Sequence, residues 1–299
     1  MKKLSLCVLL LALCLVLSAC GGGGSPSPSP TRSVGNSSPP PTDTAPPPTP
    51  SPTQTPEIKD PGGTTVGTRF APPQGFTRAD VGEGNFAAFL RDLPLKTDGM
   101  SVTLYDGSVG TVSAAAVVDI PIGESDRCQR TDALILLRAR YLYGAGLKSE
   151  IMFHFTSGFS YDYSSYSAGK RVKVSGSDVE WVSGGTALDN ETVLGNYLDV
   201  LYSYSRASTL ESLDTKEAGE LYPGVLFTDG NGAIIADMAV NAETGETAVI
   251  LIGGGSPACD LYIPPNSDAE ISPWHIVSPG GGIYIGEASF MAVDAREFN

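Results

Sequence analysis

Histidine and cysteine are scarce in this chain of 299 residues, which contains two histidines and five cysteines. Three of the cysteines lie within the first 20 residues, so Cys128 and Cys259 are the only thiols in the rest of the chain. The two histidines, His154 and His275, are far apart in the sequence. Because transition metals are held mainly by these two residue types, the sequence predicts no metal site.

Basic residues are also few: 19 lysines and arginines stand against 33 aspartates and glutamates, which gives a net charge of −14. Such a surface repels phosphate backbones and anionic lipid headgroups, so we expect no nucleic-acid partner and no electrostatic adsorption to membranes. Hydrophobic residues make up 41% of the chain, too many for a disordered acidic polymer. The composition therefore predicts a folded acidic domain.

The glycine-rich stretches lack the fingerprints of catalytic or cofactor-binding loops. Residues 253–257 read GGGSP, without the final glycine of a serine-hydrolase elbow. Residues 230–232 read GNG and lead into an apolar strand pattern rather than into a helix, unlike a dinucleotide-binding loop. We therefore expect no cofactor.

The first 20 residues have the pattern of an export signal. Two lysines precede an apolar run from Leu4 to Leu17, which is too short to span a bilayer comfortably. The run ends in LSAC, and small residues before a cysteine resemble the lipobox of bacterial lipoproteins. This resemblance implies that residues 1–19 are removed and that Cys20 is lipidated, which would anchor an extracytoplasmic protein to the bacterial membrane. The alternative is an ordinary cleaved signal with an incidental cysteine.

Residues 20–62 are predicted to be a tether between the lipid and the folded domain. Thirteen of the 23 prolines fall within the first 62 residues, among serines and threonines. Such a segment cannot bury enough apolar surface to offset its ordering entropy and favours extended polyproline II. At about 3.1 Å per residue, it could reach on the order of 120 Å from the membrane.

Residues 63–299 are predicted to be a single α+β domain, with two long helices early and a mostly antiparallel sheet late. Apolar periodicity predicts the helices over residues 126–143 and about 190–207, and a short helix after Asn85. Strand patterns are concentrated after Pro223, and earlier ones are found over residues 102–105, 112–120 and 151–155 and in a hairpin over residues 170–182. Helices and strands in separate regions favour α+β over alternating βαβ units.

Six stretches in this domain resemble the bacterial exported proteins grouped as domain of unknown function 4846. They are FAAFLRDLPL (86–95), LYDG (104–107), VVDI (117–120), DALILLRARYLY (132–143), HFTSGF (154–159) and ADMAVN (236–241). They cover most of the chain from about residue 80 to 265 in the expected order. The family name itself implies no activity.

The family pattern as a whole has a looser similarity to papain-like thiol hydrolases, including NlpC-type cell-wall endopeptidases. Many members have a cysteine at the start of the long helix and a histidine just before the strand that ends in DMAVN. The resemblance implies thiol chemistry, since a helix N-terminus lowers a thiol pKa and an imidazole supports the thiolate. It also implies a papain-like fold.

This chain departs from that pattern at the reacting positions. Arg130 occupies the cysteine position, two residues before Asp132, and Asn231 occupies the histidine position, before the strand that contains Asp237. Where members show Pro-Ala-Gln, the chain reads Pro-Ala followed by Cys259. Neither a guanidinium nor an amide can do the required chemistry at neutral pH. We therefore predict no catalytic residues and a vacated site, made of Cys128, Arg130, Asp132, Asn231, Asp237 and Cys259.

The sequence favours a lipid-anchored envelope protein that binds rather than catalyses. Its expected partners are the membrane, through Cys20, and a cell-wall peptide or glycan. Two alternatives remain: a thiol hydrolase of cell-wall peptides or amides that acts through Cys128, and a structural lipoprotein of envelope assembly. Cys128 and Cys259 could form a disulfide at the rim of the vacated site or remain independent buried thiols.

Two further features have both a functional and a packing interpretation. Tyr161, Tyr163 and Tyr166 could form a stacking surface for sugars, although half-buried packing is the more common role of such a cluster. His154 lies in an apolar strand pattern, where a histidine more often has a structural role, and His275 lies in an expected loop.

Overall fold

A computed structural model describes residues 57–229, 232–286 and 288–299. Cys20, the leader, most of the tether and Asn231 lie outside the described residues, so what was predicted for them stays a prediction. The described residues belong to one compact unit. Packing within it begins before Gly62, because Lys59 pairs with Phe70 in a β-bridge and with Asp98 in a salt bridge of 2.6 Å.

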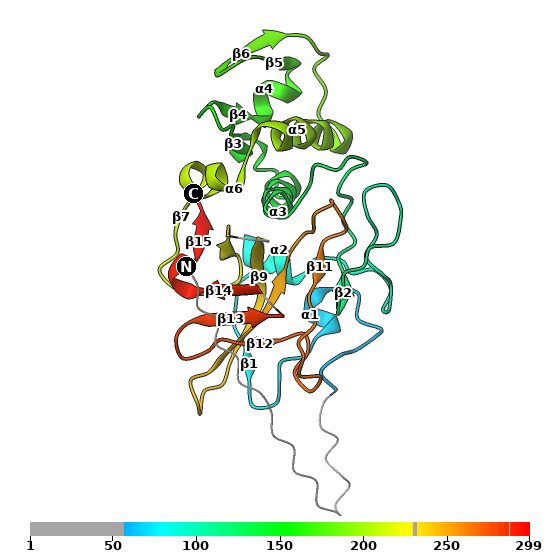
Figure 1. The fold of residues 1–299 in the computed structure, drawn as a ribbon, viewed down its shortest axis with the longest axis vertical. Helices are drawn as coiled ribbons and strands as arrows, with labels where there is room; N and C mark the ends of the chain where they lie inside the picture. The colour runs from blue at the N-terminus through cyan, green and yellow to red at the C-terminus, as the bar shows by residue number, and fades with distance from the viewer. Residues whose placement is uncertain (1–56, 230–231, 287) are drawn as a thin grey trace, which may run out of the picture. The chain divides into compact units, whose positions relative to one another are not determined.

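The core of the unit is a seven-stranded sheet whose neighbouring strands all pair antiparallel (Figure 1). Its order is β12-β10-β9-β8-β15-β7, and β1 pairs with the far end of β9. Hydrophobic residues lie on both faces of β9, which explains its apolar pattern, interrupted only by Asp237. The strands are β1 (Thr77–Arg78), β7 (Thr215–Glu217), β8 (Leu226–Phe227), β9 (Ala233–Val240), β10 (Thr247–Ile252), β12 (His275–Ile276) and β15 (Arg296–Phe298).

Four two-stranded sheets complete the strand content. They are β2 (Ala116–Val117) with β11 (Tyr262–Ile263), β3 (Met152–His154) with β4 (Ser160–Asp162), β5 (Lys170–Ser175) with β6 (Asp178–Ser183), and β13 (Gly282–Ile285) with β14 (Ala288–Met291). The β5–β6 hairpin matches the one predicted over residues 170–182.

The helices follow capping signals in the sequence. The side chain of Asn85 accepts the N–H of Ala88 at the start of α2, and Asn190 accepts that of Val193 at the start of α5. The α-helices are α1 (Val66–Arg69), α2 (Phe86–Arg91), α3 (Asp132–Gly144), α4 (Tyr163–Ser167), α5 (Glu191–Tyr204) and α6 (Ala207–Thr209). Short helices of other types are η1 (Lys148–Glu150), η2 (Leu210–Asp214) and η3 (Ala292–Asp294).

Two hydrophobic clusters lie on opposite faces of the sheet. Ile234 and Ala236 of β9 belong to the larger cluster, which includes residues of α1, α2, α3 and α5. Ala233 and Ile235 belong to the smaller one, which the β13–β14 hairpin covers. In Figure 1, α3 lies between the sheet and the end of the unit that carries α4, α5 and the β5–β6 hairpin.

The fold is α+β, as predicted, but its two long helices do not come early among the described residues. The helix predicted over about residues 190–207 is present as α5. α3 and α5 span 13 and 14 residues and begin at Asp132 and Glu191, whereas the helices before them have at most six residues. The helix predicted over residues 126–143 starts six residues late because Arg130 has a φ of 47°, in the left-handed region that a helix cannot include.

Two of the predicted strands are also shorter than expected. The pattern over residues 112–120 yields only β2, and residues 102–105 form isolated bridges, in which Thr103 pairs with Val109 and Leu104 with Cys259. His275, expected in a loop, begins β12. Among the described residues, no helix combines the length and the apolar character needed to cross a membrane.

Candidate functional site

The start of α3 contacts the loop between β10 and β11 through three hydrogen bonds. The Arg130 N–H donates to the Gly255 carbonyl at 3.1 Å, and the Ala258 N–H donates to the Asp126 carboxylate at 2.7 Å. The Ser256 hydroxyl donates to the Gln129 side-chain carbonyl at 2.7 Å. These bonds bring together the chain segments that carry Cys128 and Cys259, which are far apart in the sequence.

Glycines allow a third segment, the start of β9, to approach the same place. A β-carbon on Gly232, whose φ is +67°, would lie 2.9 Å from Cγ2 of Thr131. A β-carbon on Gly254 would lie 2.9 Å from Cβ of Ala133. Since real β-carbons do not approach other carbons so closely, backbone fills the space beside the α3 start. The region where the papain-like layout would place its reacting groups is therefore tightly packed.

Both thiols in this region are buried and free. Cys128 and Cys259 are each 1% exposed, and no disulfide joins them in this structure. Burial raises the pKa of the Cys128 thiol to about 12, although the nearby Tyr202 hydroxyl acts in the opposite direction. Burial also raises the pKa of Cys259. Because the thiolate is the nucleophile, neither cysteine has the environment of a reactive one.

Arg130 and Asp132 point to different surroundings although they are two residues apart. Arg130 is exposed to solvent. The Asp132 carboxylate accepts a hydrogen bond of 3.4 Å from the Ser205 hydroxyl, at the end of α5. Burial raises the pKa of Asp132 to about 7. The two side chains therefore do not form one site.

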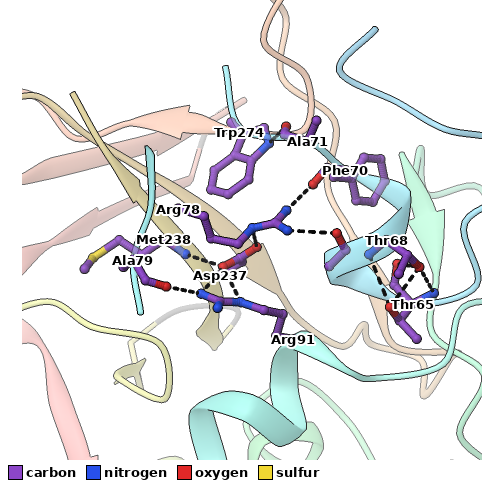
Figure 2. A network of polar contacts seen from close by, with 11 residues as sticks. Thr65, Thr68, Phe70, Ala71, Arg78, Ala79, Arg91, Asp237, Met238 and Trp274 are labelled. Atoms are coloured by element: carbon purple, nitrogen blue, oxygen red, sulfur yellow. Dashed lines mark hydrogen bonds and ion pairs between the residues drawn. The ribbon is translucent and has the colours of Figure 1, made fainter. Parts of the chain in front are cut away.

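Asp237 has a structural role elsewhere on β9, as Figure 2 shows. Its fully buried carboxylate lies 2.9 Å from Nε and 2.7 Å from Nη2 of Arg91 on α2, and 2.9 Å from Nε of Arg78 on β1. The Met238 N–H also donates to it. Burial raises the pKa of Asp237, which the two arginines counteract. This carboxylate joins the sheet to α2 and is not part of the region at the α3 start.

A cavity of about 370 Å³ lies beside α2, α3 and β15, and the Arg138 side chain forms part of its wall. The guanidinium carbon of Arg138 lies 5.3 Å from the ring centre of Phe86, 5.7 Å from that of Tyr141 and 5.5 Å from that of Phe298. Burial lowers the pKa of Arg138, but a guanidinium stays charged at neutral pH. Within the described part of the chain, no carboxylate forms a salt bridge with it.

Two carboxylates share this wall. Glu297 is already engaged, because the Tyr222 hydroxyl donates to it and the Lys216 ammonium lies 3.1 Å from it. Asp80 accepts only the N–H of Gly82 among the described groups. Among the described residues, the cavity therefore presents one cation and one carboxylate without a salt-bridge partner, on a wall that also includes Phe86, Tyr222 and Phe298. This arrangement is suited to binding a small charged molecule.

Sequence reasoning missed Arg138, although one signal was available. Arg138 directly follows the apolar run ALILL of the helix, and a partly buried charged side chain needs a partner or a cavity. For the tyrosine cluster, the structure confirms the packing interpretation that the sequence favoured. Tyr161, Tyr163 and Tyr166 are at most 5% exposed, and Tyr161 stacks on Tyr197 at 4.6 Å, so they pack the core and cannot form a sugar-binding surface.

The structure defines an α+β protein with an antiparallel sheet. Cys128 and Cys259 are buried in tightly packed surroundings beside the start of α3, and Arg138 forms part of the wall of a separate cavity. The chain belongs to the family described as "Domain of unknown function (4846)", which matches residues 66–296. This confirms the family resemblance. No curated protein and no solved structure matches the chain.

Proposed function

We propose that this protein is a lipid-anchored component of the bacterial cell envelope that binds a cell-wall peptide in the Arg138 cavity. The observation that carries the proposal is the Arg138 guanidinium in the cavity wall, which lies beside three aromatic rings and has no salt-bridge partner among the described residues. An arginine in such a place is well suited to a bidentate pair with a carboxylate. The lipobox-like segment ending at Cys20 supports the location.

The charges of the cavity favour a peptide over a neutral glycan. A ligand carboxylate would pair with Arg138, and a ligand amine would pair with Asp80. Short cell-wall peptides carry both groups. Phe86 and Phe298 would cover the apolar part of the ligand.

The region at the α3 start supports binding without thiol catalysis. Cys128 is buried with a raised pKa, and Arg130 occupies the position of the family cysteine. We therefore interpret the chain as a member of a papain-like family that does not use the cysteine site. A hydrolase acting through Cys128 would need this thiol to be accessible and ionised.

Isothermal titration calorimetry with a cell-wall stem peptide that has a free amine and a free carboxylate tests the proposal. Arg138→Gln should weaken binding about 10- to 100-fold, since a hydrogen-bonded charge contributes about 1.5–3 kcal/mol. The matched control is Arg140→Gln, two residues along α3, where Arg140 already pairs with Glu191. Equal affinity of wild type and Arg138→Gln, or no binding by the wild type, would overturn the proposal.

A further inference from the structure

Three side chains that the proposed binding site does not use form a linear series at the β3–β4 hairpin. The Asp214 carboxylate, at the end of η2, lies 2.7 Å from Nδ1 of His154 on β3. Nε2 of the same ring lies 3.2 Å from the hydroxyl oxygen of Ser160 on β4. A carboxylate, an imidazole and a hydroxyl in this order are the arrangement that activates a serine for nucleophilic attack.

The burial of the three groups increases in the order that this chemistry requires. Ser160 is exposed, the His154 side chain is 18% exposed, and that of Asp214 is 4% exposed. Asp214 also accepts the main-chain N–H of His154, at 3.4 Å, so it holds both the ring and the backbone of that residue. A proton on Nδ1 that faces this carboxylate leaves the lone pair of Nε2 directed at Ser160.

The hairpin register explains why serine and histidine meet. His154 and Ser160 are direct cross-strand partners, and the adjacent Phe155 N–H bonds to the Phe159 carbonyl. Hydrogen-bonded and non-hydrogen-bonded pairs alternate along an antiparallel ladder, so His154 and Ser160 form a non-hydrogen-bonded pair, whose side chains are closest. The N–H of Ser160 then points away from β3, where it could donate to an oxyanion.

A small cavity of about 110 Å³ adjoins this series. His154 and Asp214 line it together with the apolar Phe153, Leu213 and Phe298 and with the charged Arg138 and Glu150. The space suits a short acyl group but not a long chain or a peptide. Because Ser160 lies at the open surface, the alcohol part of an ester would stay in solvent and could be large.

We propose that Ser160 is the nucleophile of a second site, which hydrolyses short-chain carboxylic esters. Ser160 attacks the ester carbonyl carbon while its proton passes to Nε2 of His154. The bond to the alcohol oxygen then breaks, and that oxygen takes the proton from His154. Water attacks the acyl-serine, His154 accepts its proton and returns it to Ser160, and the carboxylic acid leaves. Asp214 is the positioning residue of this site.

A biotinylated fluorophosphonate and p-nitrophenyl acetate test this site on the whole purified protein. The wild type should be labelled at one serine, and peptide mass spectrometry should place the label on Ser160. It should also hydrolyse the ester at least tenfold faster than Ser160→Ala. Ser157→Ala, which changes another exposed serine of the same hairpin, should behave as wild type.

Two further variants separate chemistry from folding. His154→Gln keeps a hydrogen-bonding side chain beside Asp214 but cannot carry the proton, so it should lose labelling and turnover at an unchanged melting temperature. Asp214→Asn should reduce both at least tenfold, and Asp214→Glu should restore part of them. Labelling or turnover that survives in Ser160→Ala, or is absent from the wild type, would overturn the proposal. Stem-peptide binding should be unchanged in Ser160→Ala, so the two proposals fail separately.

Discussion

Replacing Asp132 by asparagine should stabilise the protein at neutral and alkaline pH. Burial raises the pKa of this carboxyl from 3.8 to about 7 in the folded state. A group whose folded pKa is raised favours folding below its unfolded pKa, and that contribution is lost as the pH rises from 3.8 through about 7. The charged form of Asp132 therefore opposes folding at pH 8, and asparagine removes this penalty.

The magnitude follows from the same two values. The difference between 3.8 and about 7 corresponds to roughly 4 kcal/mol at pH 8. The substitution also removes a negative charge from the first turn of α3, which costs about 0.5 kcal/mol. We expect Asp132→Asn to be more stable than wild type by about 3.5 kcal/mol at pH 8 and to lie within about 1 kcal/mol of it at pH 4.

Urea unfolding, followed by the fluorescence of Trp181 and Trp274, measures this difference at each pH. The matched control is Asp178→Asn at the exposed turn of the β5–β6 hairpin, which should leave stability unchanged at both pH values. A difference between Asp132→Asn and wild type that does not vary with pH would refute the reasoning. So would a loss of stability at pH 8.

Three other predictions follow from the lipobox, the buried carboxylate and the thiols. Radiolabelled fatty acid should be incorporated into the wild type and not into Cys20→Ala, and persistent labelling of the variant would exclude lipidation of that cysteine. Asp237→Ala should lower the free energy of unfolding by about 3 kcal/mol in urea, because it leaves Arg91 and its partner arginine without a counter-charge; a loss below about 1 kcal/mol would contradict this role. Cys128 and Cys259 should resist iodoacetamide in the native protein and both react in urea without reductant; mass spectrometry that finds them linked would contradict the free thiols of the structure.

The parts of the fold that are governed by local rules could be predicted from the sequence. Asn85 and Asn190 mark helix starts because an asparagine side chain can accept a free N–H of the first turn. β9 was predictable because a strand buried on both faces leaves a nearly continuous apolar pattern, here interrupted only by Asp237. β15 and β7 could not be predicted from the sequence, because strands of three residues form only through the tertiary contacts that hold them.

The candidate sites were less predictable, because each depends on contacts between distant segments. The start of α3 could be located from the family pattern. The tight packing around it depends on Gly232 and Gly254, and no local signal in the sequence reveals that these two glycines approach the start of α3. The meeting of Ser160 and His154 needs the register of a hairpin, and their link to Asp214 crosses sixty residues of chain. A histidine in an apolar strand gives no indication of these partners.

The position of β15 between β8 and β7 has a consequence for the order in which the sheet can assemble. The two strands that flank β15 precede it in the chain, and Asn299 then donates hydrogen bonds to the main-chain carbonyls of Asp214 and Leu213. This half of the sheet therefore cannot assemble until β15 has left the ribosome. Until then, β7 and β8 lack the strand that joins them in the sheet.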